Sequence, residues 1–516
     1  MGHLQTPGRS AVKASHRWMS RTALTAIGVS IALMAAVGIL GPSAVVVTFP
    51  AAPPLPPWYF HTHPSASVVA AVLWLAILLG VGGLGLGLAA VRRGWRPYPQ
   101  RLIIGSVLAV MALLAIPPTG SADMLLYVVS GRIAVLGHSP YVMTPGQLKS
   151  LGDPVGAVAG DIHPKDPTRY GPAAIAPEAM ASELAGTSVA RTIFWLKFWN
   201  GLAYLALVFL LDRAVRSDPA RRLRAHLMWS LNPLMLWEVI AGGHNDVLCA
   251  ALGTCALLAL RGAGSLRALA AGVMLGLATA VKAPFALFGG GLVWASRRSP
   301  PVLGMLALGA GAVLVPSYLL AGRDAISATM GTAPVGYTPW FAFARLFGLS
   351  DASFDTVGLL GFAVLAVLLL WRLPAGPLDL PAVRVALALT LAWLITSPQQ
   401  RPWYFAMVFP LLALVPASRL DWIVIIDAAV EAGAELPRLF RTSGLSPAWL
   451  GSLARIGYAG MAPVVLAACC AVVLWLCVTD SWRPLDSVSG MPERFSPRVT
   501  QGLHRRSRAG TRRMIS

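Results

Sequence analysis

The chain has 516 residues, of which 56% are hydrophobic and only 12% are charged, and its mean hydropathy is +0.67. Because soluble proteins carry about 25% charged residues, this composition excludes a soluble enzyme and a disordered chain and predicts an all-α polytopic membrane protein. The net charge is +20, from 41 Lys and Arg against 21 Asp and Glu.

Apolar segments follow one another along most of the chain. A membrane-spanning helix needs about 20 mainly apolar residues, and we predict spans near 23–48, 66–91, 102–118, 187–211, 225–241, 247–260, 267–281, 284–295, 302–321, 354–371, 382–396, 403–417 and 457–479. The first segment is too long for the apolar part of a cleavable signal peptide. The short pieces within 267–295 can form a hairpin of two half-helices with Lys282 at its tip.

The stretch 420–440 leaves two alternatives open. It is apolar but carries Asp421, Asp427, Glu431 and Glu435, so it is either a further span with a polar face or an interfacial helix. The basic C-terminal tail reaches the same side as the other basic clusters only if this stretch spans, which favours about 14 spans over 13.

Arginine supplies most of the positive charge and lies between the spans. Cytoplasmic loops are rich in Lys and Arg, and clusters such as Arg92/Arg93 and Arg297/Arg298 fall inside if the N-terminus is cytoplasmic. Loop 49–65 has no Lys or Arg and falls outside. Most of the positive charge therefore serves to keep these loops on the cytoplasmic side of the membrane, and we expect no nucleic-acid partner.

This threading predicts a multi-pass plasma-membrane protein with both termini in the cytoplasm. We expect a basic N-terminus over 1–22, a membrane domain over 23–479 and a basic, disordered tail over 480–516. The five cysteines all lie in apolar stretches, where they are expected to be small buried side chains. No cysteine or histidine spacing predicts a metal site.

Five pieces of the chain are expected on the outer side and together can build one site: 119–186, 242–246, the tip at Lys282, 322–353 and 397–402. The first of them is unusually long, and loops of this length are usually functional or disordered.

The first candidate site residue is Asp123, which follows the third span in Ser121-Ala-Asp123. It either caps the next helix or acts as a partly desolvated carboxylate, able to serve as a general base. Downstream, Tyr141 and Tyr170 lie in tight turns, where they are either turn residues or aromatic groups that face a sugar.

Three cations stand out because they lie in or beside apolar segments. Lys282 interrupts a long apolar run, Lys197 lies within Phe194–Asn200, and Arg401 joins two spans beside Trp403. A buried ammonium is costly unless it is paired, faces a cavity or extends to the interface. Guanidinium groups bind phosphate through two parallel hydrogen bonds, so Arg401 is placed to hold a lipid phosphate.

The remaining polar candidates lie in two short connections. Residues His244, Asn245 and Asp246 share one hairpin tip, which is more polar than a turn requires, although a metal site from them alone is not expected. In the other connection Gln400, Trp403 and Tyr404 flank Arg401; Trp and Tyr there either anchor the membrane interface or contact substrate.

In these pieces the chain resembles the actinobacterial polyprenol-phosphomannose-dependent α-1,6-mannosyltransferases of the GT-C superfamily. The resemblance covers about 100–410 and rests on ordered motifs, namely Ser-Ala-Asp123-Met-Leu-Leu-Tyr127 with Gly137-His-Ser-Pro-Tyr141, Tyr170-Gly-Pro172, Leu231-Asn-Pro233 before Gly243-His-Asn-Asp246, Val281-Lys282-Ala-Pro284, and Gln400-Arg-Pro-Trp-Tyr404. Each motif alone is weak evidence for this family, but five motifs in the same order and on the same predicted side of the membrane are fairly specific.

The resemblance implies an inverting transfer of mannose from polyprenyl phosphate to a mannan acceptor outside the membrane, in cell-envelope lipomannan synthesis. We expect no protein-bound cofactor apart from the donor substrate, and the residues leave a metal requirement open. Asp123 would be the base in the outer catalytic loop 119–186, and Arg401, Lys282 and Lys197 would bind the donor phosphate. Contacts to sugar or prenyl would come from Tyr127, Tyr141, Tyr170, His244, Asn245, Asp246, Gln400, Trp403 and Tyr404.

Two other functions remain open from the residues. A GT-C enzyme that uses another polyprenyl-phosphate sugar would need the same base, cations and aromatic groups. A flippase for lipid-linked sugars would share them too, but it predicts an internal repeat and ionisable residues at mid-membrane. No convincing repeat is evident, which favours a site on one side.

Overall fold

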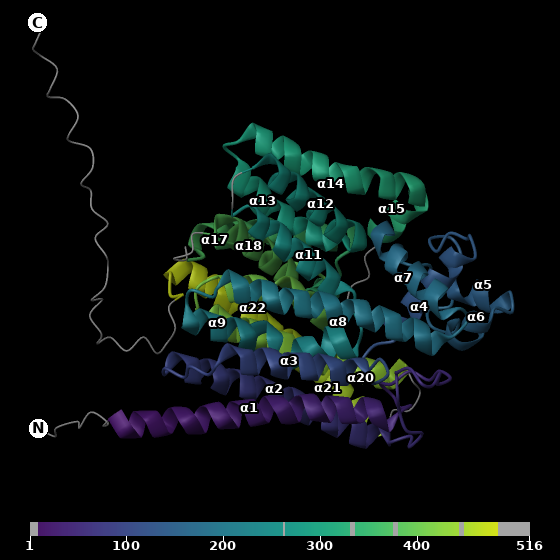
Figure 1. Cartoon of the computed structure of the whole chain (residues 1–516), viewed down its shortest axis with the longest axis horizontal. Coiled ribbons are helices and arrows are strands. Elements are labelled where there is room, and N and C mark those ends of the chain that lie inside the picture. The colour runs from purple at the N-terminus through teal and green to yellow at the C-terminus, as the bar shows by residue number, and fades with distance from the viewer. Residues whose placement is uncertain (1–8, 262–263, 331–335, 375–379, 443–447, 483–516) are drawn as a thin grey trace, which may run out of the picture.

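The computed structural model describes residues 9–261, 264–330, 336–374, 380–442 and 448–482. Over these residues the chain forms helices and no β-strand, which confirms the predicted all-α class. The long helices lie side by side in one bundle, and four short helices, α4–α7, gather at one end of it (Figure 1). We call this end the loop end. The predicted tail falls almost wholly outside the described residues.

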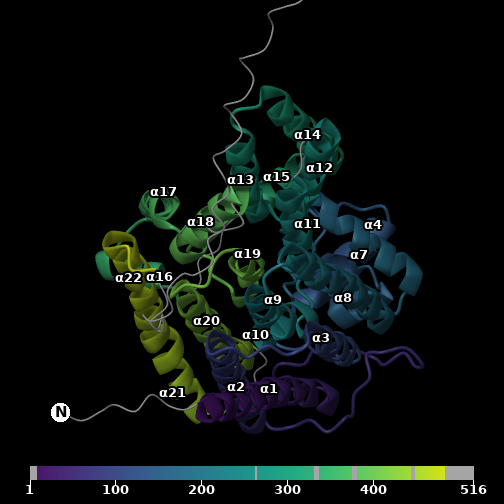
Figure 2. The same cartoon turned by 60° about the vertical axis from the view of Figure 1, so that its left-hand side comes forward.

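Among the described residues, six helical stretches are long and apolar enough to cross a membrane. They lie in α1 (Arg9–Leu40), α2 (Ala66–Arg92), α8 (Val189–Ala214), α14 (Pro300–Ala321), α17 (Asp351–Arg372) and the run of α21 (Ala448–Ile456), η5 (Gly457–Met461) and α22 (Ala462–Thr479). α14 and α17 lie at the periphery (Figure 2). They expose apolar side chains such as Leu320 and Val367, which suits a surface in contact with lipid.

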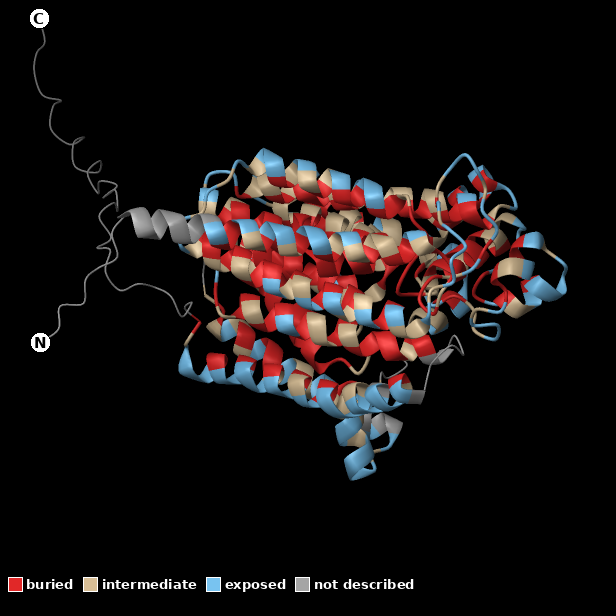
Figure 3. Cartoon of the chain, turned by 90° about the horizontal axis from the view of Figure 1, so that it is seen from below, coloured by how far each residue is buried: buried red, intermediate tan, exposed pale blue. Residues whose placement is uncertain are grey.

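Shorter apolar helices complete the bundle, and buried residues concentrate in its interior (Figure 3). They are α3 (Pro99–Leu114), α11 (Asp246–Ala259), α12 (Ser265–Val281), η3 (Ala283–Ala286), α13 (Leu287–Ser296), α18 (Pro381–Thr396), η4 (Pro402–Met407) and α19 (Phe409–Leu414). Lys282 lies at the turn between α12 and α13, as predicted for the hairpin of half-helices.

The prediction of a single helix over 225–241 is wrong in detail, because the helix is interrupted there. It forms α9 (Pro219–Ala225), η1 (His226–Ser230), α10 (Pro233–Met235) and η2 (Leu236–Ala241). Pro233 has no N–H to continue a helical ladder, and the Asn232 side chain accepts a hydrogen bond from Leu234 N at 3.1 Å. The Tyr204 hydroxyl donates to Trp229 O, which satisfies one carbonyl near the break.

The course of α20 (Leu420–Thr442) bears on the two alternatives for 420–440. Near its start Asp421 pairs with Arg224, in the last turn of α9, and near its other end Glu435 pairs with Arg401 at the loop end. The 14 residues from Asp421 to Glu435 cover about 21 Å at 1.5 Å per residue. α20 therefore runs through the bundle, as the spanning alternative requires.

The 119–186 segment is folded rather than a disordered loop. It contains α4 (Asp123–Val135), α5 (Pro145–Ser150), α6 (Pro154–Ala159) and α7 (Pro172–Ala185) around a small apolar core. Arg132 and Asp153 pair at 2.8 Å across it. Two further short helices, α15 (Arg323–Met330) and α16 (Pro339–Phe347), belong to the 322–353 piece. The folded segment fixes the start of α4, which carries Asp123.

Candidate active site

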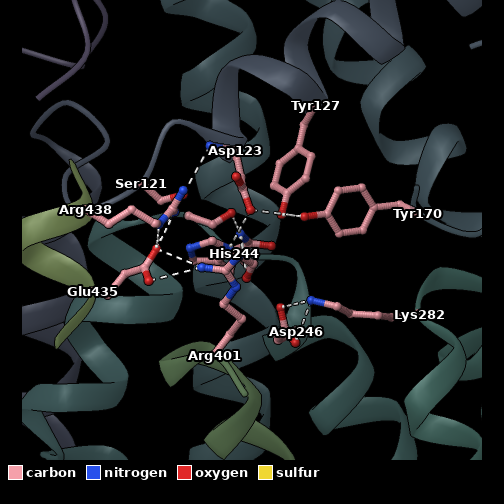
Figure 4. Close-up of polar contacts among 12 residues, drawn as sticks. Ser121, Asp123, Tyr127, Tyr170, His244, Asp246, Lys282, Arg401, Glu435 and Arg438 are labelled. Carbon is pink, nitrogen blue, oxygen red and sulfur yellow. Dashed lines mark hydrogen bonds and ion pairs between the residues drawn. The ribbon is translucent and has the colours of Figure 1, made fainter. Parts of the chain in front are cut away.

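Asp123 is the first residue of α4, and its carboxylate is left available by the way this helix starts. Its side chain makes no capping hydrogen bond; instead the Ser121 hydroxyl accepts from Asp123 N at 3.1 Å. The Tyr170 hydroxyl donates to Asp123 Oδ2 at 3.2 Å, and the Tyr127 hydroxyl donates to that of Tyr170 at 3.0 Å (Figure 4). The capping alternative for Asp123 is therefore wrong, and the carboxylate faces the site with 21% of its side chain exposed.

His244 forms one wall beside this carboxylate. Its Nδ1 lies 3.8 Å from Asp123 Oδ2, and its ring stacks on Trp403 with 3.8 Å between ring centroids. Among the described residues neither ring nitrogen has a hydrogen-bond partner, although the side chain is fully buried. Trp403 is only 5% exposed, so interface anchoring does not describe it.

The protonation states follow from burial and nearby charge. Burial lowers the pKa of His244 to about 3, against the opposing charge of Asp123, so the imidazole is neutral at physiological pH. Burial alone would raise the pKa of Asp123, but its electrostatic interactions with His244 and with Arg401 act in the other direction, and the pKa is lowered. With His244 neutral, Arg401 is the main cation that keeps Asp123 ionised. Burial also raises the pKa of Tyr170, which stays a hydrogen-bond donor.

The Lys282 ammonium does not extend to the interface but is buried and paired. Its Nζ donates to both carboxylate oxygens of Asp246, at 2.8 and 2.9 Å. It also lies 4.5 Å from the ring centroid of Tyr404 and 5.4 Å from that of Tyr170, within the range of cation–π attraction. The structure thus brings together four predicted residues from four separate connections.

A second charge cluster lies around Arg401. Its Nη1 is 3.0 Å from both carboxylate oxygens of Glu435, and Arg438 donates to the same carboxylate. The Arg401 guanidinium also lies 5.7 Å from the Trp403 ring centroid. Figure 4 shows this cluster on the opposite side of His244 from Tyr127 and Tyr170.

The other predicted residues lie in or behind this constellation. The Tyr141 hydroxyl donates to Tyr170 O at 3.1 Å and so holds the turn that carries Tyr170. The Gln400 side chain donates to Leu394 O and Ile395 O at the end of α18. Lys197 is fully buried and donates to Leu113 O and Ile116 O at the end of α3. Their contacts therefore lie within the protein framework, and the first two fix segments of the site.

The arrangement combines an ionised carboxylate, two paired cations and several aromatic rings. A carboxylate with a lowered pKa can accept a proton from a hydroxyl. Paired Lys and Arg side chains beside it can exchange partners with a phosphate. Among the described residues no group of three or more His, Cys, Asp or Glu is placed to hold a metal ion. The geometry suits group transfer from a phosphate to a hydroxyl.

Comparison with known proteins identifies the family. Residues 25–298, just over half of the chain, match the family described as alpha-(1->6)-mannopyranosyltransferase, N-terminal domain. The chain belongs to this family. The mannosyltransferase resemblance expected from the motifs is confirmed, and the protein is a membrane glycosyltransferase.

Two curated relatives of this mannosyltransferase are mycobacterial. The chain is 26% identical to alpha-(1->6)-mannopyranosyltransferase A of Mycobacterium tuberculosis over 393 residues, which are 67% of this chain and 71% of the relative. It is 25% identical to a probable alpha-(1->6)-mannopyranosyltransferase of Mycolicibacterium smegmatis over 142 residues, 28% of this chain and a quarter of the relative's length. No solved structure matches the chain.

Sequence reasoning missed three residues of this mannosyltransferase site. Glu435 was recognised only as part of a polar helix face, and Arg438 was not singled out. Glu178 of α7 is 2% exposed, and its carboxylate oxygens have no hydrogen-bond partner among the described residues. The signal available for Glu435 and Arg438 was their i, i+3 spacing at the end of α20; an isolated Glu178 in an amphipathic helix gives no such signal.

Proposed function

We propose that the protein transfers mannose from polyprenyl-phosphate mannose to a mannan acceptor, with formation of an α-1,6 linkage and inversion at the anomeric carbon. The reaction would serve lipomannan-type glycan synthesis in the cell envelope. The observation that carries the proposal is the ionised Asp123 carboxylate, held by Tyr170 beside two cations of the loop end. Family membership supports mannose as the sugar.

In the proposed step, Asp123 takes the proton from the acceptor 6-hydroxyl while the oxygen of that hydroxyl attacks the anomeric carbon of the donor mannose. One glycosidic bond forms, the bond from the anomeric carbon to the phosphate oxygen breaks, and its electron pair stays on the phosphate. Direct displacement at a β-linked donor gives the α-linked product without a covalent intermediate. Tyr170, which donates to Oδ2, keeps one carboxylate oxygen oriented.

Arg401 and Lys282 would stabilise the charge that develops on the leaving phosphate. Each is already held by a carboxylate, Glu435 and Asp246 respectively, so that its position is fixed before the donor binds. Trp403 and Tyr404 lie beside these cations and would contact the sugar or the first prenyl unit. Lys197 is not assigned a role in phosphate binding, because its ammonium donates hydrogen bonds to two backbone carbonyl groups.

We place the loop end outside the cytoplasm of a plasma-membrane protein. The support is the distribution of basic residues: clusters such as Arg92/Arg93 and Arg221/Arg222 lie at the other ends of the helices that lead to the loop end. Both termini would then be cytoplasmic. An outer site gives direct access to a mannan acceptor, while the polyprenyl donor reaches the site from the membrane.

The variant Asp123→Asn tests the proposal. It removes the base but keeps a polar side chain of the same shape, and we expect mannosyl transfer by isolated membranes to fall at least 100-fold, the lower range for general-base catalysis. The matched control is Asp161→Asn, an exposed carboxylate in the same segment that pairs with Lys149. Expression and elution in detergent should be unchanged in both variants. Near-normal transfer by Asp123→Asn removes Asp123 from the role of base.

The choice of sugar is tested separately. Membranes that contain the protein are incubated with labelled polyprenyl-phosphate mannose or with the arabinosyl or glucosyl analogue, and the linkage of the product is mapped. We expect label only from the mannosyl donor, at the 6-position. Transfer from another donor alone, or movement of intact donor across the membrane without transfer, would contradict the proposal.

A further inference from the structure

A small pocket lies behind the Tyr127 side chain, between α7, α8 and the connection that leads from η2 to α11. Its volume is about 20 Å³, and a cavity needs about 10–15 Å³ to hold one water molecule. The pocket therefore has room for about one water molecule and for no larger ligand. Its wall includes the polar residues Glu178, Trp199 and Asn245, and most of the other wall residues are apolar.

Three buried polar groups of this wall have no hydrogen-bond partner within the part of the chain that the structure describes. They are the Glu178 carboxyl and the Asn245 amide, each with both of its polar atoms, and the indole N–H of Trp199. Glu178 is 2% exposed and Asn245 is 7% exposed. Unpaired buried polar groups are unfavourable, and buried water molecules typically form about three hydrogen bonds to groups of this kind.

The three groups match the hydrogen-bonding capacity of one water molecule. The indole of Trp199 can only donate, whereas the Glu178 and Asn245 side chains each carry an oxygen that accepts. One water molecule can accept from Trp199 and donate to both other side chains, which gives three hydrogen bonds. Burial raises the pKa of the Glu178 carboxyl, so this group is neutral and needs no counter-charge in the wall.

Such a water molecule would hold a connection that carries two residues of the site. The backbone of this connection is already fixed, because Asn200 Nδ2 donates to Gly243 O at 2.8 Å and to His244 O at 3.3 Å. Asn245 lies between His244, whose ring lies beside the proposed base, and Asp246, which pairs with one cation of the site. A fixed Asn245 side chain therefore limits the movement of both neighbours.

We propose that the pocket binds one ordered water molecule, which joins Glu178 and Trp199 to the Asn245 side chain and so positions His244 and Asp246. Glu178, Trp199 and Asn245 are positioning residues and do not touch the substrates. The kinetic part of this inference rests on the proposed function, whereas the water site itself does not.

The water site is tested by an experimental structure of the purified protein at a resolution that shows ordered water molecules. We expect one water peak within about 3.2 Å, the upper range for a hydrogen bond, of polar atoms of Glu178, Asn245 and Trp199. Direct hydrogen bonds among these side chains, or a pocket without a water peak, would overturn the proposal.

The positioning role is tested with two variants of Glu178. Glu178→Leu removes the accepting oxygen, and we expect kcat for mannosyl transfer to fall about tenfold, since a misplacement of 1 Å can cost about 100-fold. The KM values for polyprenyl-phosphate mannose and for a mannan oligosaccharide should stay within about threefold. Glu178→Gln keeps both a donor and an acceptor and should restore kcat to within about threefold of the wild type. Glu183→Leu, on the exposed side of α7, is the matched control.

Trp199→Phe provides a second test, which decides the question if Glu178→Leu fails to fold. It deletes the N–H but keeps an aromatic ring. The loss of one hydrogen bond corresponds to about a two- to twelvefold effect, and we expect kcat to fall within that range with both KM values retained. Trp195→Phe is the matched control, since Trp195 lies on the same helix outside the pocket wall.

The outcomes separate this inference from the proposed function. An unchanged kcat in both Glu178→Leu and Trp199→Phe, with an active wild type, overturns the positioning role. Equal damage in Glu178→Gln and Glu178→Leu also overturns it, because the amide keeps the hydrogen bonds. A selective rise of the acceptor KM would make Glu178 a substrate contact, against the proposal. A wild type that transfers no mannose overturns the proposed function, and the water peak then decides the inference about the pocket.

Discussion

At the scale of single residues, the site is built from charges that already have partners. Lys282 and Asp246 form one buried pair, and Arg401 and Arg438 share the Glu435 carboxylate. Removing one member of a buried pair leaves an uncompensated charge, which is much less favourable than removing both. These side chains are thus held in place by electrostatics rather than by packing alone.

The pair of Lys282 and Asp246 gives a prediction about stability. Asp246→Asn should destabilise the folded protein by about 3–5 kcal/mol, because the Lys282 ammonium is then buried without its counter-charge. Thermal unfolding in detergent, followed by intrinsic fluorescence, measures the effect. The double variant Asp246→Asn/Lys282→Met should recover part of the loss. Equal stability of Asp246→Asn and wild type would show that the pair contributes little.

The protonation states give a prediction about pH. Because the pKa of Asp123 is lowered and that of His244 is about 3, neither group should titrate between pH 5.5 and pH 7.5, and kcat/KM should be flat over that range. Arg401→Gln removes a cation beside Asp123, so the pKa of Asp123 should rise. The acidic limb of the profile should then move to higher pH, in addition to any loss of donor affinity.

The control for this profile is Arg213→Gln, at the other end of α8. If kcat/KM of the wild type falls with an apparent pKa near 6.5, and this fall is absent in His244→Asn, the neutral state assigned to His244 is contradicted. If the acidic fall of kcat/KM occurs at the same pH in Arg401→Gln as in the wild type, the coupling between Arg401 and Asp123 is contradicted.

At the scale of elements, close helix packing depends on glycine at particular positions. α12 and α14 approach so closely that a Cβ on Gly272 would lie 2.2 Å from Leu306 O, and one on Gly309 would lie 2.3 Å from Leu269 O. Small residues allow such approach between helices in a membrane, where packing and not the hydrophobic effect favours association. This packing supports α12, which ends at Lys282.

We therefore expect Gly309→Ala to lower thermal stability and to reduce transfer, because α14 must move away from α12. Gly311→Ala is the matched control on the same helix, since a Cβ there meets nothing within 4 Å. Stability is measured by thermal unfolding in detergent and transfer in membranes. Equal behaviour of the two variants would contradict the close approach of α12 and α14.

The limits of sequence reasoning also show at this scale. Hydropathy predicted most apolar helices and the turn at Lys282, because span length and periodicity are local properties. It missed the break around Pro233, and it left the course of α20 open between a span and an interfacial helix, because that course depends on the pairing of Asp421 with Arg224 and of Glu435 with Arg401. The small pocket that borders Glu178, Asn245 and Trp199 was equally hidden, since its walls come from helices far apart in the chain.

At the scale of the whole molecule, the arrangement predicts which side each end faces. Cysteine introduced at His138, on the exposed surface of the loop end, should react with a membrane-impermeant maleimide in intact cells. Cysteine at Ser217, at the other end of α8, should react only after permeabilisation. The native cysteines lie in apolar helices and provide a low background. The reverse labelling pattern would invert the proposed orientation.

The paired charges of the site have a consequence for turnover. Asp123, Asp246 and Glu435 are balanced by Lys282, Arg401 and Arg438, so the empty site is electrically neutral when all six are ionised. The proposed donor, a phosphodiester, would bring one negative charge, and the proposed proton transfer to Asp123 would leave this total unchanged. Once Asp123 releases its proton to water, the site holds a phosphate with two negative charges against the same three cations. The site then carries one more negative charge than it does with the intact donor bound, and this excess would favour release of the spent lipid carrier.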